Sequence, residues 1–215
     1  MNIRLLNSLM LMICPILMIV IWMVLEPLLI GEVDSGLVGA AQAEAYLKLA
    51  SEKGALPYLI DIPGTFALIG TMLGIAFLGR SLQGSGAAYG YLSASIFSVL
   101  ITIPIIATGM WFSSIEMFNE GGNVEMAITI SMVADSAFAG MPLFWCLGIA
   151  LLGLGLVIEK GFLPIWIGGL MLVIGLVGIP ALLILGDAAF ILWLISLVLA
   201  VASGVVLFMR RAQES

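Results

Sequence analysis

The stretch TISMVADSAFAGMPLFWCLG, residues 129–148, contains a single charged residue, Asp135. No other charge interrupts the apolar sequence from Met126 to Ile158, a run of 33 residues. As one α-helix this run would be about 50 Å long, whereas the hydrocarbon core of a bilayer is roughly 30 Å thick. The run therefore predicts a membrane-spanning helix, and it raises the question whether Asp135 lies within the membrane or beyond its edge.

The composition of the whole chain also indicates a membrane protein. Of its 215 residues, 63% are hydrophobic and 9% are charged. Soluble domains contain about 45–50% apolar and about 25% charged residues, so a soluble fold is excluded. The apolar runs are continuous and do not alternate with polar residues, which argues against an outer-membrane barrel. We expect an all-α, polytopic transmembrane bundle that forms one domain over residues 1–215.

The apolar runs predict six membrane spans and one long external loop. The loop covers residues 31–58 and contains a short amphipathic helix. The apolar face of that helix is predicted to consist of Leu37, Ala41, Ala45 and Leu49. We interpret this helix as a cap on the bundle, with partner binding or gating as the alternative. The six predicted spans are residues 6–30, 59–79, 88–111, 140–158, 163–184 and 188–209.

The distribution of basic residues predicts the orientation of the chain. The positive-inside rule places both termini in the cytoplasm, because five basic residues then lie inside and two outside. This orientation suits a multi-pass protein of a bacterial plasma membrane, the cell inner membrane. The five predicted cytoplasmic residues are Arg4, Arg80, Lys160, Arg210 and Arg211, and the two external ones are Lys48 and Lys53.

The length of the fourth apolar run suggests a position for Asp135. Counting back ~20 residues from the charged turn at Glu159, the length needed to cross a bilayer, leaves Asp135 roughly one turn outside the hydrocarbon. We therefore predict that residues 126–139 form a separate outer interfacial helix. It would join the span at a break near Gly140–Pro142, because proline removes a backbone donor.

The alternative is that Asp135 is a functional carboxylate. Glu26, Asp61, Glu116 and Asp135 come from four different segments, and all are predicted to lie near the outer end of their helices. Together they would form an outer vestibule that binds a cation or relays a proton. Carboxylates alone suit calcium or magnesium better than zinc or copper.

The residues that the chain lacks also limit its chemistry. There is no histidine, and the two cysteines, Cys14 and Cys146, lie in apolar runs where free thiols are favoured over a disulfide. Imidazole ligation of haem, zinc clusters and histidine general-base catalysis are therefore excluded. We expect no cofactor, no resident metal and no catalytic residue, so a membrane enzyme is the third choice of function.

Small residues recur where helices would pack together. Gly70 and Gly74 form a GxxxG pair, and residues 169–178 carry a second set of glycines. Ser95, Ser98 and Thr102 form a polar stripe, for which interhelical packing is favoured over a substrate path. We therefore expect a non-enzymatic accessory or structural subunit of a membrane complex. Its partners would be the lipid bilayer and other membrane subunits bound through these Gly/Ser-rich faces, with no nucleic acid. The alternative is a small transporter or ion-coupled permease that uses the outer carboxylates.

The C-terminal third of the chain carries a recognisable turn and tail. Its turn reads G-x-LP-x-x-x-G, with Gly161, Leu163, Pro164 and Gly168, and its basic tail is formed by Arg210 and Arg211. In these features it resembles a family of uncharacterised bacterial six-helix membrane proteins, which also have a long first external loop. The resemblance implies six spans, and it brings no catalytic residues.

Overall fold

The computed structural model describes residues 3–34, 36–121 and 123–214, and side chains for all of these except 187–188 and 211–214. Regular structure in these ranges is helical throughout. Six helices are long and apolar enough to cross a membrane. The predicted all-α class and the six candidate spans are therefore confirmed, while the orientation of the termini stays a prediction. The candidate spans are Ile3–Leu29, Leu56–Arg80, Ala87–Asn119, Val124–Ile158, Ile165–Leu185 and Phe190–Arg210.

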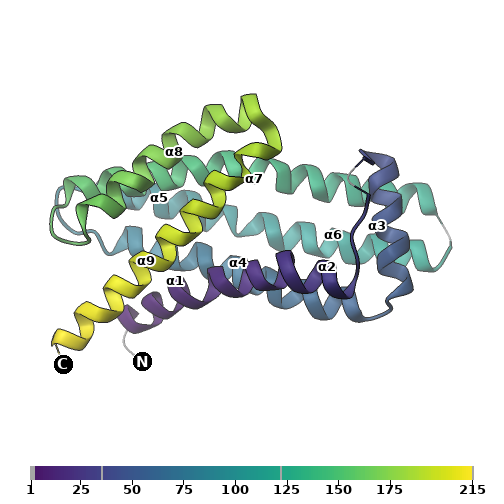
Figure 1. The fold of residues 1–215 in the computed structure, drawn as a ribbon, viewed down its shortest axis with the longest axis horizontal. Helices are drawn as coiled ribbons and strands as arrows, with labels where there is room; N and C mark the ends of the chain where they lie inside the picture. The colour runs from purple at the N-terminus through teal and green to yellow at the C-terminus, as the bar shows by residue number, and fades with distance from the viewer. Residues whose placement is uncertain (1–2, 35, 122, 215) are drawn as a thin grey trace. The chain divides into compact units, whose positions relative to one another are not determined.

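The helices follow one another along the chain, and the longest connection, residues 30–39, lies between α2 and α3 (Figure 1). In chain order they are α1 (Ile3–Val20), the π-helix η1 (Ile21–Leu25), α2 (Glu26–Leu29), α3 (Ala40–Glu52), α4 (Leu56–Arg80), α5 (Ala87–Leu100), α6 (Thr102–Asn119), α7 (Val124–Ile158), α8 (Ile165–Leu185), the 3₁₀ helix η2 (Gly186–Ala189) and α9 (Phe190–Glu214).

The chain divides into two compact units. Unit 1 consists of Met1–Ile16, Leu68–Ile101 and Met141–Ser215, and unit 2 consists of Leu17–Ala67 and Thr102–Gly140. The helices α4 and α7 contribute residues to both units, whereas α5 belongs to unit 1 and α6 to unit 2.

Unit 1 is held together by close helix contacts at glycines. A Cβ atom on Gly175 of α8 would lie 2.5 Å from the backbone nitrogen of Ala150 in α7. A Cβ on Gly70 of α4 would lie 2.5 Å from the sulfur of Cys14 in α1. These glycines therefore pack helices of the same chain against one another. The antiparallel pair α8 and α9, joined by η2, completes this unit (Figure 1).

In unit 2 the short helix α3 packs against α6 (Figure 1). Leu47 and Ala50 of α3 form a buried cluster with Ile115 of α6 and Ala127 of α7. A short helix therefore does form in the loop, as α3, but its buried face differs from the one expected. Its external location stays a prediction.

The buried residues of α3 are Ala43, Leu47 and Ala50, not the predicted set. Ala41 is exposed, and Leu37 precedes the first helical residue, Ala40. Apolar and small residues occur on several sides of this helix, so its own pattern did not select one face. The contact with α6 selects it.

The predicted break at Gly140–Pro142 is wrong, because α7 is one continuous helix of 35 residues that includes Pro142. No separate interfacial helix over residues 126–139 forms. A proline removes one backbone hydrogen bond, but an apolar helix in a membrane keeps its remaining internal bonds because hydrocarbon offers its backbone no other partner. The third span also differs, since α6 continues it to Asn119 with only Ile101 between α5 and α6.

Candidate functional site

Unit 2 contains a cavity of about 620 Å³, which we call the acidic cavity. Residues from the first span, the following loop, and α3, α4, α6 and α7 line it. They include four acidic residues, and no lysine or arginine is among the described lining residues. The lining consists of Trp22, Glu26, Gly31, Glu32, Val33, Gln42, Ala43, Tyr46, Asp61, Trp111, Ser131, Asp135 and Phe138.

The π-helix η1 brings two lining residues to this cavity. Trp22 lies within η1, and the backbone N–H of Glu26 donates to the carbonyl of Ile21, five residues earlier. Pro27 follows and cannot donate a backbone hydrogen bond. A single π-turn changes the helical phase, and such turns are frequent at functional sites. The turn therefore determines which side of the first span presents Trp22 and Glu26.

Glu26 is bonded to α3 through Tyr46. The Tyr46 hydroxyl donates to Glu26 Oε1 over 3.4 Å, which is a long hydrogen bond. Burial raises the pKa of the Tyr46 hydroxyl above its ordinary value, and the charges of Asp61 and Glu26 raise it further. The hydroxyl therefore remains a donor to Glu26, and α3 contributes a polar group to the cavity in addition to covering it.

Asp61 is the most buried carboxylate of the cavity, with 7% of its surface exposed. It accepts a hydrogen bond from the indole of Trp22. Gly64, one turn further along α4, makes this contact possible, because a Cβ there would lie 2.5 Å from Trp22 Nε1. The indole is a neutral donor, so this bond brings no opposite charge to Asp61.

Asp135 accepts a hydrogen bond of 2.9 Å from Nε1 of Trp111. Its side chain is exposed, and its partner comes from α6 rather than from Asp61. Phe138, one turn further along α7, stacks on Trp111 with ring centroids 5.1 Å apart. It also meets the edge of Trp22 at 6.4 Å. Three aromatic rings in contact therefore line the same cavity as Asp61 and Asp135.

Of the four carboxylates predicted to form a vestibule, Glu26, Asp61 and Asp135 line the acidic cavity. Glu116 is exposed on α6 and does not line it. Within residues 3–34, 36–121 and 123–214, no group of three or more Asp, Glu, Cys or His side chains is arranged to hold a metal ion. The geometry therefore offers no support for the predicted calcium or magnesium site.

Sequence reasoning missed the remaining polar and aromatic lining. Glu32 follows the first span directly, but it is not among the predicted site residues. Tyr46 is also absent from that set, because the pattern of its helix is interpreted from the aliphatic residues alone. The sequence does not mark Trp22 and Phe138 as site residues, because a single aromatic residue in an apolar run is typical of any membrane helix. One available sign was Pro27 next to Glu26, since proline often accompanies a disturbed helix.

Comparison of the chain with protein-family models, with curated proteins and with solved structures finds no match.

Proposed function

We propose that this chain is a small multi-pass membrane transporter or permease that binds a cation in the acidic cavity. The observation that carries the proposal is the lining itself: Glu26, Asp61 and Asp135 reach one cavity from three different helices, without a basic residue among the described lining residues. Ionisable residues within membrane helices are costly, and they commonly mark ion or substrate paths.

Asp61 supports the proposal most strongly. It is buried, and the partner that accounts for its hydrogen bond is the neutral indole of Trp22. A buried carboxylate is stable only when it is paired or hydrogen-bonded, and an ionised one benefits most from an opposite charge. A bound cation would supply that charge.

The aromatic rings favour an organic cation, such as a substituted ammonium, over a bare metal ion. Trp22, Trp111, Tyr46 and Phe138 all line the cavity. A cation over the face of such a ring gains about 0.5–2 kcal/mol, with tryptophan the best partner. A cavity of about 620 Å³ is also within the usual range for small-molecule sites, roughly 300–1,000 Å³. The positive-inside rule predicts that this cavity opens to the outside.

The accessory-subunit hypothesis loses one of its two supports. It rests on the lack of catalytic groups and on the abundance of small-residue faces that partner subunits could contact. In unit 1, Gly70 contacts Cys14 and Gly175 contacts Ala150 and Cys146, so helices of the same chain already pack against these two glycines. An accessory role stays a prediction, but these glycine faces do not favour it.

The test is cation binding by the purified protein in detergent, followed by uptake into proteoliposomes. Tetraethylammonium is the probe, and calcium serves as the comparison cation. We expect Asp61→Asn, which keeps the shape and the hydrogen-bond acceptor for Trp22, to weaken tetraethylammonium binding by about tenfold or more, because one buried charge is removed.

Glu116→Gln is the matched control, since it removes one carboxylate outside the cavity. It should change the affinity less than about twofold, the small effect expected of an exposed charge. Circular dichroism would verify the fold of both variants. Equal losses in the two variants, or the absence of both binding and uptake in the unmodified chain, would overturn the proposal.

A further inference from the structure

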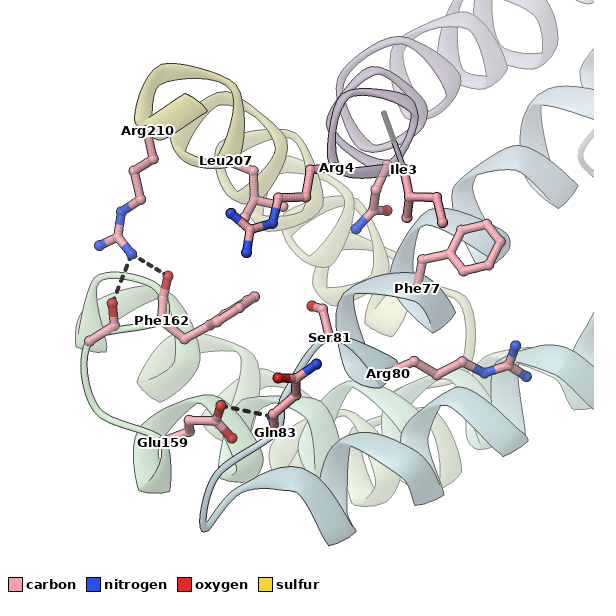
Figure 2. Close-up of a pocket in the computed structure, with 12 residues that line it drawn as sticks. Ile3, Arg4, Phe77, Arg80, Ser81, Gln83, Glu159, Phe162, Leu207 and Arg210 are labelled. Carbon is pink, nitrogen blue, oxygen red and sulfur yellow. Dashed lines mark hydrogen bonds between the residues drawn. The ribbon is translucent and has the colours of Figure 1, made fainter. Parts of the chain in front are cut away.

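Unit 1 contains a second cavity, of about 690 Å³, which shares no residue with the acidic cavity (Figure 2). We call it the basic cavity. It lies where four segments meet: the start of α1, the end of α4, the α7–α8 turn and the C-terminal part of α9. Its polar lining includes three arginines and one glutamate, so positive charge predominates. The arginines are Arg4, Arg80 and Arg210, the glutamate is Glu159, and Asn7 and Phe162 also line the cavity.

Two of the arginines are held by neutral acceptors. Arg210 donates to the carbonyls of Gly161, over 2.8 Å, and of Phe162. Arg80 is directed away from Arg210, toward α5, where it donates to Ser98 Oγ (Figure 2). These bonds orient the guanidinium groups but do not neutralise their charge. Arg4 is directed into the cavity from α1 (Figure 2). Arginine forks are well suited to phosphate oxygens.

A buried asparagine, Asn7, also indicates a ligand in this cavity. It lines the cavity, only 5% of its surface is exposed, and within the described part of the chain its buried Oδ1 has no hydrogen-bond partner. In the same part of the chain, the buried Oε2 of Glu159 also has no hydrogen-bond partner. The other oxygen, Glu159 Oε1, accepts a hydrogen bond of 2.9 Å from the backbone N–H of Gln83. An unsatisfied buried acceptor is energetically unfavourable, so a ligand that donates a hydrogen bond to either atom would be stabilised.

The positive charge of the arginines favours an anionic group, whereas the unsatisfied acceptors of Asn7 and Glu159 favour hydroxyl or N–H donors. A single ligand that satisfies both carries a phosphate and a hydroxylated substituent. From this geometry we propose that the basic cavity binds a polyol phosphate, either as the headgroup of an anionic phospholipid such as phosphatidylglycerol or as a free molecule such as glycerol 3-phosphate. The phosphate lies near Arg4 and Arg210, and the hydroxyl groups donate to Asn7 Oδ1 and Glu159 Oε2.

The position of the cavity is compatible with a lipid. It lies at the ends of apolar helices, and Ile3, Phe77 and Leu207 add apolar side chains to its lining. Basic pockets between membrane helices are known to bind anionic headgroups in this way. A free polyol phosphate would use the same polar groups without these apolar ones.

The experiment measures ligand binding to delipidated protein in detergent by native mass spectrometry and calorimetry. The probes are short-chain phosphatidylglycerol, phosphatidic acid, which lacks the hydroxylated substituent, and phosphatidylcholine, which has no net charge. We expect phosphatidylglycerol to bind about tenfold more tightly than phosphatidylcholine, and more tightly than phosphatidic acid. Competition by glycerol 3-phosphate would identify the soluble polyol phosphate as the ligand. If glycerol 3-phosphate does not compete, the ligand is the lipid headgroup.

Three variants test the residues. Arg4→Gln and Arg210→Gln should each weaken binding by about five- to tenfold, since each removes one charged contact. Asn7→Leu should abolish the preference for phosphatidylglycerol over phosphatidic acid. Lys160→Gln is the control, because Lys160 is an exposed basic residue of the α7–α8 turn that does not line the cavity.

Losses as large in Lys160→Gln as in Arg210→Gln would mean that only general surface charge acts, and would overturn the proposal. Equal affinity of the unmodified chain for all three lipids, without competition by glycerol 3-phosphate, would overturn it as well. Arg210 is an exposed residue, so its variant should fold even if Asn7→Leu does not.

Discussion

The contact between α7 and α8 gives a sharp prediction for Gly175→Ala. The new Cβ would lie 2.5 Å from both the nitrogen of Ala150 and the carbonyl oxygen of Cys146, and 2.7 Å from the Cβ of Ala150. Two of these three atoms belong to the backbone and cannot rotate away. Ordinary contact distances are about 3.5–4.0 Å, so the helices must separate by roughly 1 Å. Such overpacking costs about 1–3 kcal/mol.

Gly169→Ala, on the same helix, is the matched control. A Cβ at Gly169 meets nothing within 4 Å. This variant should gain the helix propensity of alanine, up to about 1 kcal/mol, without a clash. The free energies of unfolding of the two variants should therefore differ by about 2–4 kcal/mol.

The assay is equilibrium unfolding in mixed micelles, with sodium dodecyl sulfate as the denaturant and circular dichroism as the signal. Gly175→Ala should unfold at a clearly lower fraction of dodecyl sulfate than Gly169→Ala. If the two variants unfold together, the close α7–α8 contact is wrong. In that case the face of α8 that carries Gly175 would be available to a partner subunit.

Two further predictions concern unit 2 and topology. The hydroxyls of Thr65 and Thr108 are buried and 2.8 Å apart. Each single change to valine should lower the free energy of unfolding by about 1–2 kcal/mol, and the double variant should lower it by less than the sum. Strict additivity in unfolding experiments would show that the pair does not interact. For topology, a cysteine at the exposed position of Glu52 should react with a membrane-impermeant maleimide added from outside, and reaction only from the cytoplasmic side would contradict the predicted orientation. The native Cys14 and Cys146 lie within candidate spans, which shields them from that reagent.

The depth of the site residues along their helices could be predicted from the sequence, but the side of the helix on which each residue lies could not. Glu26, Asp61 and Asp135 were grouped because each lies near the end of an apolar run, and these three do line one cavity. The same argument includes Glu116, but that residue is exposed and does not line the cavity. The position of a residue along a span follows from counting, whereas the side of the helix that it occupies depends on the neighbouring helices. A π-turn such as η1, which changes the phase within a span, makes that side harder still to predict.

The sequence by itself determined the class of the protein and the number of its apolar helices. The physical reason is that hydrocarbon cannot hydrogen-bond to a backbone, so each long apolar run must form a helix wherever it packs. Tertiary structure alone decided which faces meet: that Gly175 packs against α7, that Leu47 rather than Ala41 is buried in α3, and that Asn7 lines one cavity with Arg80 and Arg210. Such choices depend on contacts between segments, and because apolar residues surround most of these helices, no periodic pattern marks the contacting side in advance.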